Sequence, residues 1–280
     1  MRYFEILPID KRGIQFALAA SIISAGILFP ANAHSRPARN ATASSPAAPT
    51  QPRKLPETPS GRASIDKAIK AGVYAESDDV VEQIRALGDK ALDGDETAMT
   101  RLMAKAQQGN AFAQSTLGFF CLLGRAGVPQ DDKQAAQWFR KAAEQGETDS
   151  QGMMGLFYAN GRGVPRDYGL AALWLTLAAS HHDHLAQLNL GSFFAAGKGG
   201  VPQNNVVAYA LFDLSGLSDL VDDDSGNDPV FSKQFRASFV KGLTQQEIKD
   251  GKALSREMSR SGDVVKAINQ YLYGHDSKRP

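Results

Sequence analysis

Three histidines lie close together in this 280-residue sequence, and imidazole nitrogens are common ligands of transition metals. They are His181, His182 and His184, with Asp183 between them. A zinc site needs three or four ligands that converge at fixed geometry, and no histidine or carboxylate elsewhere is spaced to complete one. We therefore interpret the stretch as a solvated turn. The three histidines remain the chain's candidates for a metal site, but no metal is assigned.

The acidic stretch from Asp222 to Asp228 has the composition of a calcium loop but not its spacing. With Gly226 at the sixth position of that motif, the first and twelfth ligand positions fall on Val221 and Ser232. The sequence also contains no nucleophile elbow and no phosphate-binding glycine loop. It therefore predicts no catalytic residue and no cofactor, and we expect a protein that is not an enzyme.

The middle of the sequence is organised by a motif that occurs three times. Ala-Gln-x-x-Leu-Gly at 113–118 returns as Ser-Gln-x-x-Met-Gly at 150–155 and as Ala-Gln-x-x-Leu-Gly at 186–191. Each copy continues with a second glycine, a Val-Pro pair and a capping residue. A fixed period of 36 or 37 residues is typical of a solenoid. The residues that define the repeat are Gly118, Gly155 and Gly191; Gly124, Gly161 and Gly197; Asp131, Asp167 and Asn204; and Trp138 and Trp174.

Each copy is expected to form two helices. In the first helix, small and apolar residues such as Ala113, Leu117 and Gly118 fall on one face of a 3.6-residue spiral. A glycine-rich loop with a proline follows, and the proline bars the first helix from continuing. The capping residue, Asp131 in the first copy, can accept hydrogen bonds from the free amides of the second helix. One helix pair cannot bury its apolar face alone, so the copies are expected to stack.

These residues resemble the Sel-one-like repeats (SLR), which are related to the tetratricopeptide repeats. The resemblance rests on the Ala-Gln, Leu-Gly, Gly-Val and Trp-Phe elements of residues 113–143 and on their counterparts in the second copy. The third copy departs from the pattern at Leu211, where the tryptophan would stand. The resemblance implies an all-α fold, a right-handed α/α superhelix used mainly for binding proteins. Some secreted members linked with β-lactam hydrolysis carry cysteine pairs, whereas this chain has only Cys121.

The N-terminal residues have the parts of an export signal. Lys11-Arg12 precedes an apolar run at 14–29, and the small-residue triplet 31–33 predicts cleavage between Ala33 and His34. An uncleaved membrane anchor is the alternative, because the run is about as long as the shortest membrane spans. We predict a signal peptide at 1–33, a disordered Pro/Ala/Ser-rich tether at 34–64, N-terminal capping helices at 65–109, repeats at 110–146, 147–182 and 183–219, and an acidic loop with C-terminal capping helices at 220–280.

The charge balance limits the kinds of partner. Residues 65–280, which remain after the predicted signal peptide and tether, carry 23 basic and 27 acidic side chains. A nucleic-acid partner would require a clustered basic face, so none is expected. Membrane contact is expected only through the signal segment if it stays uncleaved. The oligomeric state is left open.

Phenylalanine occupies the same position of the predicted first helix in every copy, at Phe120, Phe157 and Phe193. These rings either pack between neighbouring repeats, as aromatic residues do in such stacks, or line a concave groove in which a peptide could bind. Under the second interpretation the candidate groove residues are Ser115, Phe119, Phe120, Leu156, Phe157, Leu188, Ser192 and Phe193.

The sequence thus predicts an exported, periplasmic solenoid that binds a protein or peptide partner in the envelope and serves as a non-catalytic scaffold. One alternative is a peptidoglycan-associated accessory protein or hydrolase of the cell wall. Another is a secreted effector that binds a host protein, because the signal specifies only passage across the inner membrane. If the signal stays uncleaved, we expect anchoring to the inner membrane instead of release.

Overall fold

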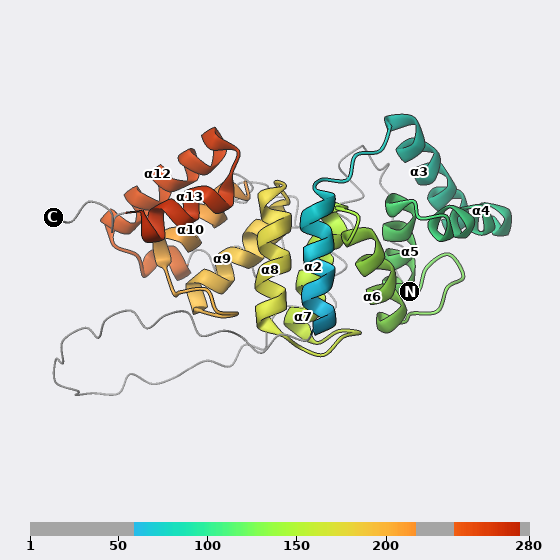
Figure 1. The fold of residues 1–280 in the computed structure, drawn as a ribbon, viewed down its shortest axis with the longest axis horizontal. Coiled ribbons are helices and arrows are strands. Elements are labelled where there is room, and N and C mark those ends of the chain that lie inside the picture. The colour runs from blue at the N-terminus through green and yellow to red at the C-terminus, as the bar shows by residue number, and fades with distance from the viewer. Residues whose placement is uncertain (1–58, 217–237, 275–280) are drawn as a thin grey trace, which may run out of the picture. The chain divides into compact units, whose positions relative to one another are not determined.

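The computed structural model describes residues 59–216 and 238–274. Within them every regular element is an α-helix, and none has both the length and the apolar character of a membrane span. Residues 59–216 and 243–274 belong to one compact unit (Figure 1). Its helices are α2 (Pro59–Ala71), α3 (Asp78–Leu92), α4 (Glu96–Gln107), α5 (Ala111–Leu123), α6 (Asp132–Ala143), α7 (Thr148–Asn160), α8 (Tyr168–Ser180), α9 (His184–Ala196), α10 (Asn205–Leu214), α12 (Gln245–Ser261) and α13 (Val264–Tyr273).

The three copies of the motif are the helix pairs α5/α6, α7/α8 and α9/α10. From α3 to α10 each helix packs mainly on the next one along the chain, and α12 then packs on α10. Packing between successive neighbours is the defining property of a solenoid, because each repeat supplies the core for the repeat beside it. The structure therefore confirms the all-α solenoid that the sequence predicts.

The glycine of each Leu-Gly or Met-Gly pair lets the two helices of a repeat approach closely. A Cβ atom at Gly155 would lie 2.7 Å from Cγ of Leu175, which is closer than a real contact. The same crowding occurs at Gly118 against the ring of Phe139, at 2.8 Å. In the third repeat the pair is Gly191 and Phe212, at 2.7 Å. Each second helix thus places a large side chain where its first helix has none.

The loop inside each repeat has the same construction in all three copies. The second glycine, for example Gly124 with φ of 63°, ends the first helix in the left-handed conformation. The Asp131 carboxylate then accepts hydrogen bonds from the amides of Lys133 and Gln134, at 2.8 and 3.0 Å. The amide of Asp131 donates to the carbonyl of Cys121 at 2.8 Å and closes the loop. Asp167 caps α8 in the same way, and Asn204 caps α10 through the amide of Val207 alone, as the sequence indicates.

Helix α2 begins at Pro59, inside the segment that the sequence predicts to be a disordered tether. Figure 1 shows it alongside α8, with which it is in contact. Its residues Ile65 and Ala68 are fully buried, at 2% and 0% exposure. Lys67 forms an ion pair with Glu144 at 3.0 Å. The expected tether is therefore corrected for residues 59–64, which are the first turns of α2 and include Ser64, whose hydroxyl donates a hydrogen bond to the Glu144 carboxylate. Residues 34–58 lie outside the described part.

Helices at both ends of the repeats cover apolar faces. At the N-terminal side, Ile84 of α3 and Leu102 of α4 join a buried cluster with Leu117 of α5. At the C-terminal side, the capping box of Thr244 and Glu247 opens α12. Gly251 of α12 meets the Tyr209 ring so closely that a Cβ would lie 2.6 Å from it. These contacts are those expected of capping helices.

Candidate protein-binding face

A buried glutamine near the start of each first helix links that helix to the preceding helix pair. The three side chains, Gln114, Gln151 and Gln187, are at most 4% exposed. Each amide reaches back eight residues to a carbonyl in the last turn of the preceding helix, which also accepts a backbone amide of the turn that follows. The acceptors are the carbonyl oxygens of Ala106 (2.9 Å), Ala143 (3.5 Å) and Ala179 (3.4 Å). Sequence reasoning recorded these glutamines as part of the motif but missed their role, which their recurrence in an apolar face could have indicated.

Replacing Gln151 by leucine is expected to lower the free energy of unfolding by about 1 kcal/mol, because a buried hydrogen bond between repeats is lost while the Ala143 carbonyl keeps the Gly146 amide as a donor. The measurement is urea denaturation followed by circular dichroism. Gln203 is the matched control: it makes the same bond over the same spacing, to the carbonyl of Ala195 at 3.1 Å, but it is exposed. Gln203→Leu is expected to change stability by less than about 0.5 kcal/mol. Equal losses in the two variants would contradict the assigned role of the buried glutamine.

Two acidic residues cap first helices where two repeats meet, and Glu147 is buried while Asp183 is half-buried. Glu147, at 8% exposure, accepts hydrogen bonds from the amides of Ser150 (2.7 Å) and Asp149 (3.3 Å) at the start of α7. Burial, reinforced by the charge of Asp149, raises the pKa of Glu147 to about 7. Asp183 caps α9 through the amide of Ala186, and burial raises its pKa to about 7 as well. Each of these carboxyl groups therefore exchanges a proton near neutral pH.

The three candidate metal ligands do not converge in the structure. His181 is the C-terminal cap of α8, and its Nδ1 lies 3.1 Å from Oε1 of Gln151. Burial lowers the pKa of His181, and the neighbouring His182 adds to this effect. His182 is exposed with φ of 65°, and His184 is the exposed first residue of α9. Among the described residues no group of three or more His, Cys, Asp or Glu side chains could hold a metal.

The repeated phenylalanines lie in the interior. Phe120, Phe157 and Phe193 are 6%, 2% and 1% exposed. The Phe157 ring meets the Phe139 ring of the preceding repeat edge to face, with centroids 5.6 Å apart. The Phe193 ring meets Tyr168 of the preceding repeat at 6.1 Å. These contacts fit packing between repeats, and the three rings offer almost no surface to a ligand in this conformation.

The other five candidate groove residues divide into buried and half-buried positions. Ser115 and Leu156 are buried, at 4% and 8% exposure, and Ser115 is hydrogen-bonded to the Glu147 carboxyl group. Phe119, Leu188 and Ser192 are half-buried. We call these last three residues the first-helix face. Whether a ligand contacts this face stays a prediction, and the cleavage position at 33–34 lies outside the described residues.

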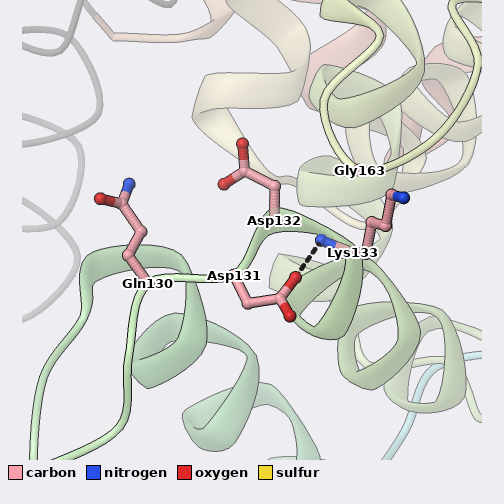
Figure 2. Close-up of a pocket in the computed structure, with 5 residues that line it drawn as sticks. All are labelled: Gln130, Asp131, Asp132, Lys133 and Gly163. Carbon is pink, nitrogen blue, oxygen red and sulfur yellow. Dashed lines mark hydrogen bonds between the residues drawn. The ribbon is translucent and has the colours of Figure 1, made fainter.

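A shallow hollow of about 440 Å³ lies beside the loop between α5 and α6. Figure 2 shows its lining and the hydrogen bond that the Asp131 carboxylate accepts from the Lys133 amide. Asp131 is occupied as a helix cap, and Asp132 forms an ion pair with Arg162 at 2.7 Å. The lining contributes no pair of groups arranged as nucleophile and base. Its residues are Gln130, Asp131, Asp132, Lys133 and Gly163.

The fold and the row of stacked helix pairs define an α/α solenoid repeat protein. The Sel1 repeat family matches residues 111–147, 148–183 and 184–217, each range comprising one first helix and one second helix. Residues 111–217 therefore form three Sel1 (SLR) repeats. Proteins built from these repeats are generally protein-interaction scaffolds without catalytic activity.

Three known proteins are similar to the chain. The first is a protective antigen of uropathogenic Escherichia coli that displays an SLR fold (26% identity, 76% of this chain, 41% of that chain, TM-score 0.51). The second is a Sel1 repeat protein from Oxalobacter formigenes (28% identity, 50% of this chain, 97% of that chain, TM-score 0.40). The third is the ERAD-associated E3 ubiquitin-protein ligase component HRD3A of Arabidopsis thaliana (40% identity over 57 residues, 20% of this chain). The chain spans less than half of the E. coli protein and 8% of the Arabidopsis protein.

Proposed function

We propose that this protein is a non-catalytic scaffold of the bacterial envelope that binds a protein or peptide through the first-helix face of its Sel1 repeats. The observation that carries the proposal is the stack of three complete repeats. Its polar groups serve structural bonds: the buried Gln151 links repeats, the exposed Asp131 caps a helix, and the buried Glu147 is enclosed between two repeats. A rigid stack of this kind suits recognition, because its surface is formed before the partner arrives.

The side of the stack formed by the second helices is already used by the chain itself. Helices α2 and α13 both contact α8, and Ile65 of α2 is buried there. The first-helix face is therefore the better candidate for a partner. Phe119 and Leu188 supply partly exposed apolar surface, and Ser192 supplies a hydroxyl group. A helix or an extended peptide could bury the two apolar side chains as anchors.

The envelope location rests on the sequence of the first 33 residues. A basic pair at 11–12, an apolar run at 14–29 and the triplet 31–33 have the order of an export signal. Export would place the repeats in the periplasm, where a protein partner of the envelope is within reach. Fractionation of cells that express the full chain is expected to release it with the periplasm; retention in the cytoplasm would overturn this part of the proposal.

The binding face is tested by site-specific photo-crosslinking in cells. A photoreactive residue in place of Phe119 or Leu188 is expected to crosslink to one protein partner in stoichiometric amounts. The same residue in place of Lys133, on the exposed side of α6, is the control and is expected to give no such product. Equal labelling at all three positions would contradict the assigned face. If the chain is retained on cell-wall sacculi and causes their turnover, the scaffold proposal is wrong and the alternative of a cell-wall enzyme is supported.

A further inference from the structure

A row of carboxylates runs along the exposed side of α3. Asp78, Glu82, Asp89 and Asp93 follow one another at intervals of four, seven and four residues. At 3.6 residues per turn these intervals place all four in one narrow sector of the helix surface. All four are exposed, and in the described part only Glu82 has an ion pair, with Arg85 at 2.8 Å. We call these four residues the acidic stripe.

A row of basic side chains runs along α12 in the same manner. Lys249, Lys252, Arg256 and Arg260 follow one another at intervals of three, four and four residues. All four are exposed, and within residues 59–216 and 238–274 only Arg260 has an ion pair, with Glu257 on the same helix. The opposite side of α12 packs on α10. We call these four residues the basic stripe.

The two stripes have opposite charge and similar length. At a rise of 1.5 Å per residue they extend over roughly 22 Å on α3 and roughly 17 Å on α12. The helix α3 stands before the first repeat in the order of contacts and α12 stands after the third, and no ion pair joins the two in the described residues. We propose that the acidic stripe of one copy binds the basic stripe of a second copy, so that copies associate head to tail.

A second copy can neutralise the charges of both stripes, whereas an anionic membrane or polymer could neutralise only those of the basic stripe. Such a surface would attract α12 but repel the acidic stripe, and residues 65–280 carry 27 acidic side chains against 23 basic ones. Beside Asp93, Leu92 is 46% exposed and adds apolar surface to the acidic end. A contact between two different surfaces is heterologous and can add further copies. Because exposed ion pairs are individually weak and are screened by salt, the association is weak and depends strongly on ionic strength.

The test is sedimentation velocity of the full chain and of two charge-reversed variants. One variant carries Asp78→Lys, Glu82→Lys and Asp89→Lys; the other carries Lys252→Glu and Arg256→Glu. At about 20 mM salt and protein above about 100 μM, the wild-type average mass is expected to rise with concentration and to return to that of a monomer at about 0.5 M salt. Each variant alone is expected to stay monomeric. An equimolar mixture of the two is expected to associate again, because each supplies the charge that the other has lost.

The experiment with the mixture distinguishes the pairing of the two stripes from a general effect of net charge on association. A wild-type chain that stays monomeric at low salt, or a mixture that does not associate, overturns the proposal. Binding to phosphatidylglycerol vesicles tests the competing interpretation, in which the basic stripe contacts an anionic membrane. If they bind the wild type and not the α12 variant while the wild type remains monomeric, the basic stripe serves an anionic membrane and the proposed pairing is wrong. Circular dichroism spectra and melting temperatures equal to those of the wild type establish that both variants are folded.

Discussion

Replacing Phe157 by alanine is expected to lower the free energy of unfolding by about 3–5 kcal/mol, as for other large aromatic residues removed from a core. Phe157 is 2% exposed, and its ring packs edge to face on Phe139 of the preceding repeat. The substitution therefore opens a cavity at the junction between the first and second repeats. Urea denaturation monitored by circular dichroism measures the loss. Because a solenoid is coupled only through its neighbours, the weakened junction is also expected to make unfolding less cooperative.

Phe119→Ala is the matched control for this prediction. Its ring contacts the same Phe139 ring, with centroids 4.9 Å apart, but Phe119 is only half-buried. A loss of about 1–2 kcal/mol is expected, since less surface leaves water contact on folding. If Phe157→Ala costs no more than Phe119→Ala, Phe157 does not fill the junction, and it becomes a groove candidate again.

The repeat could be predicted because its signals are local. Gly118 has to be small, Gly124 has to adopt a left-handed conformation, and Asp131 has to cap a helix a few residues away. Each requirement restricts the residue type at one position, and the restriction recurs with the period of the fold. The helix pairs, the caps and the family could therefore be derived without coordinates.

Features that depend on contacts between distant residues could not be predicted. Helix α2 follows a proline-rich segment, and it is held by burial of Ile65 and by Glu144, which lies about 80 residues further along the chain. The periodicity placed Ser115 and Leu156 on the expected side of their helices, but it did not give their depth, and both are buried. The raised pKa of Glu147 likewise depends on which repeats enclose it, and that information is absent from its local sequence.

Raising the pH from about 5 to about 8 is expected to destabilise the protein, with Glu147 and Asp183 as the main cause. Burial raises the pKa of each to about 7, above the ordinary values of 4.5 for a glutamate and 3.8 for an aspartate. The folded state then binds the proton more tightly than the unfolded state does. The contribution is fully present below the unfolded pKa and is lost as the pH rises through about 7. For Glu147 it amounts to at most about 3 kcal/mol. His181 acts in the opposite direction, because burial lowers its pKa and its protonation at acidic pH opposes folding.

Glu147→Gln tests the assignment to one residue. The amide oxygen can take the place of Oε2 and still accept from the amide of Ser150, so only the longer bond from the amide of Asp149 to Oε1 is lost. The amide group carries no charge to desolvate. Urea denaturation is expected to show a gain in stability at pH 8, little change at pH 5, and a smaller difference between the two. Asp131→Asn is the control, because Asp131 caps α6 through the same two kinds of bond while exposed to water, so burial does not oppose its charge. A variant Glu147→Gln that loses stability at pH 8, or keeps the wild-type difference, would show that the charged carboxylate stabilises the junction between repeats.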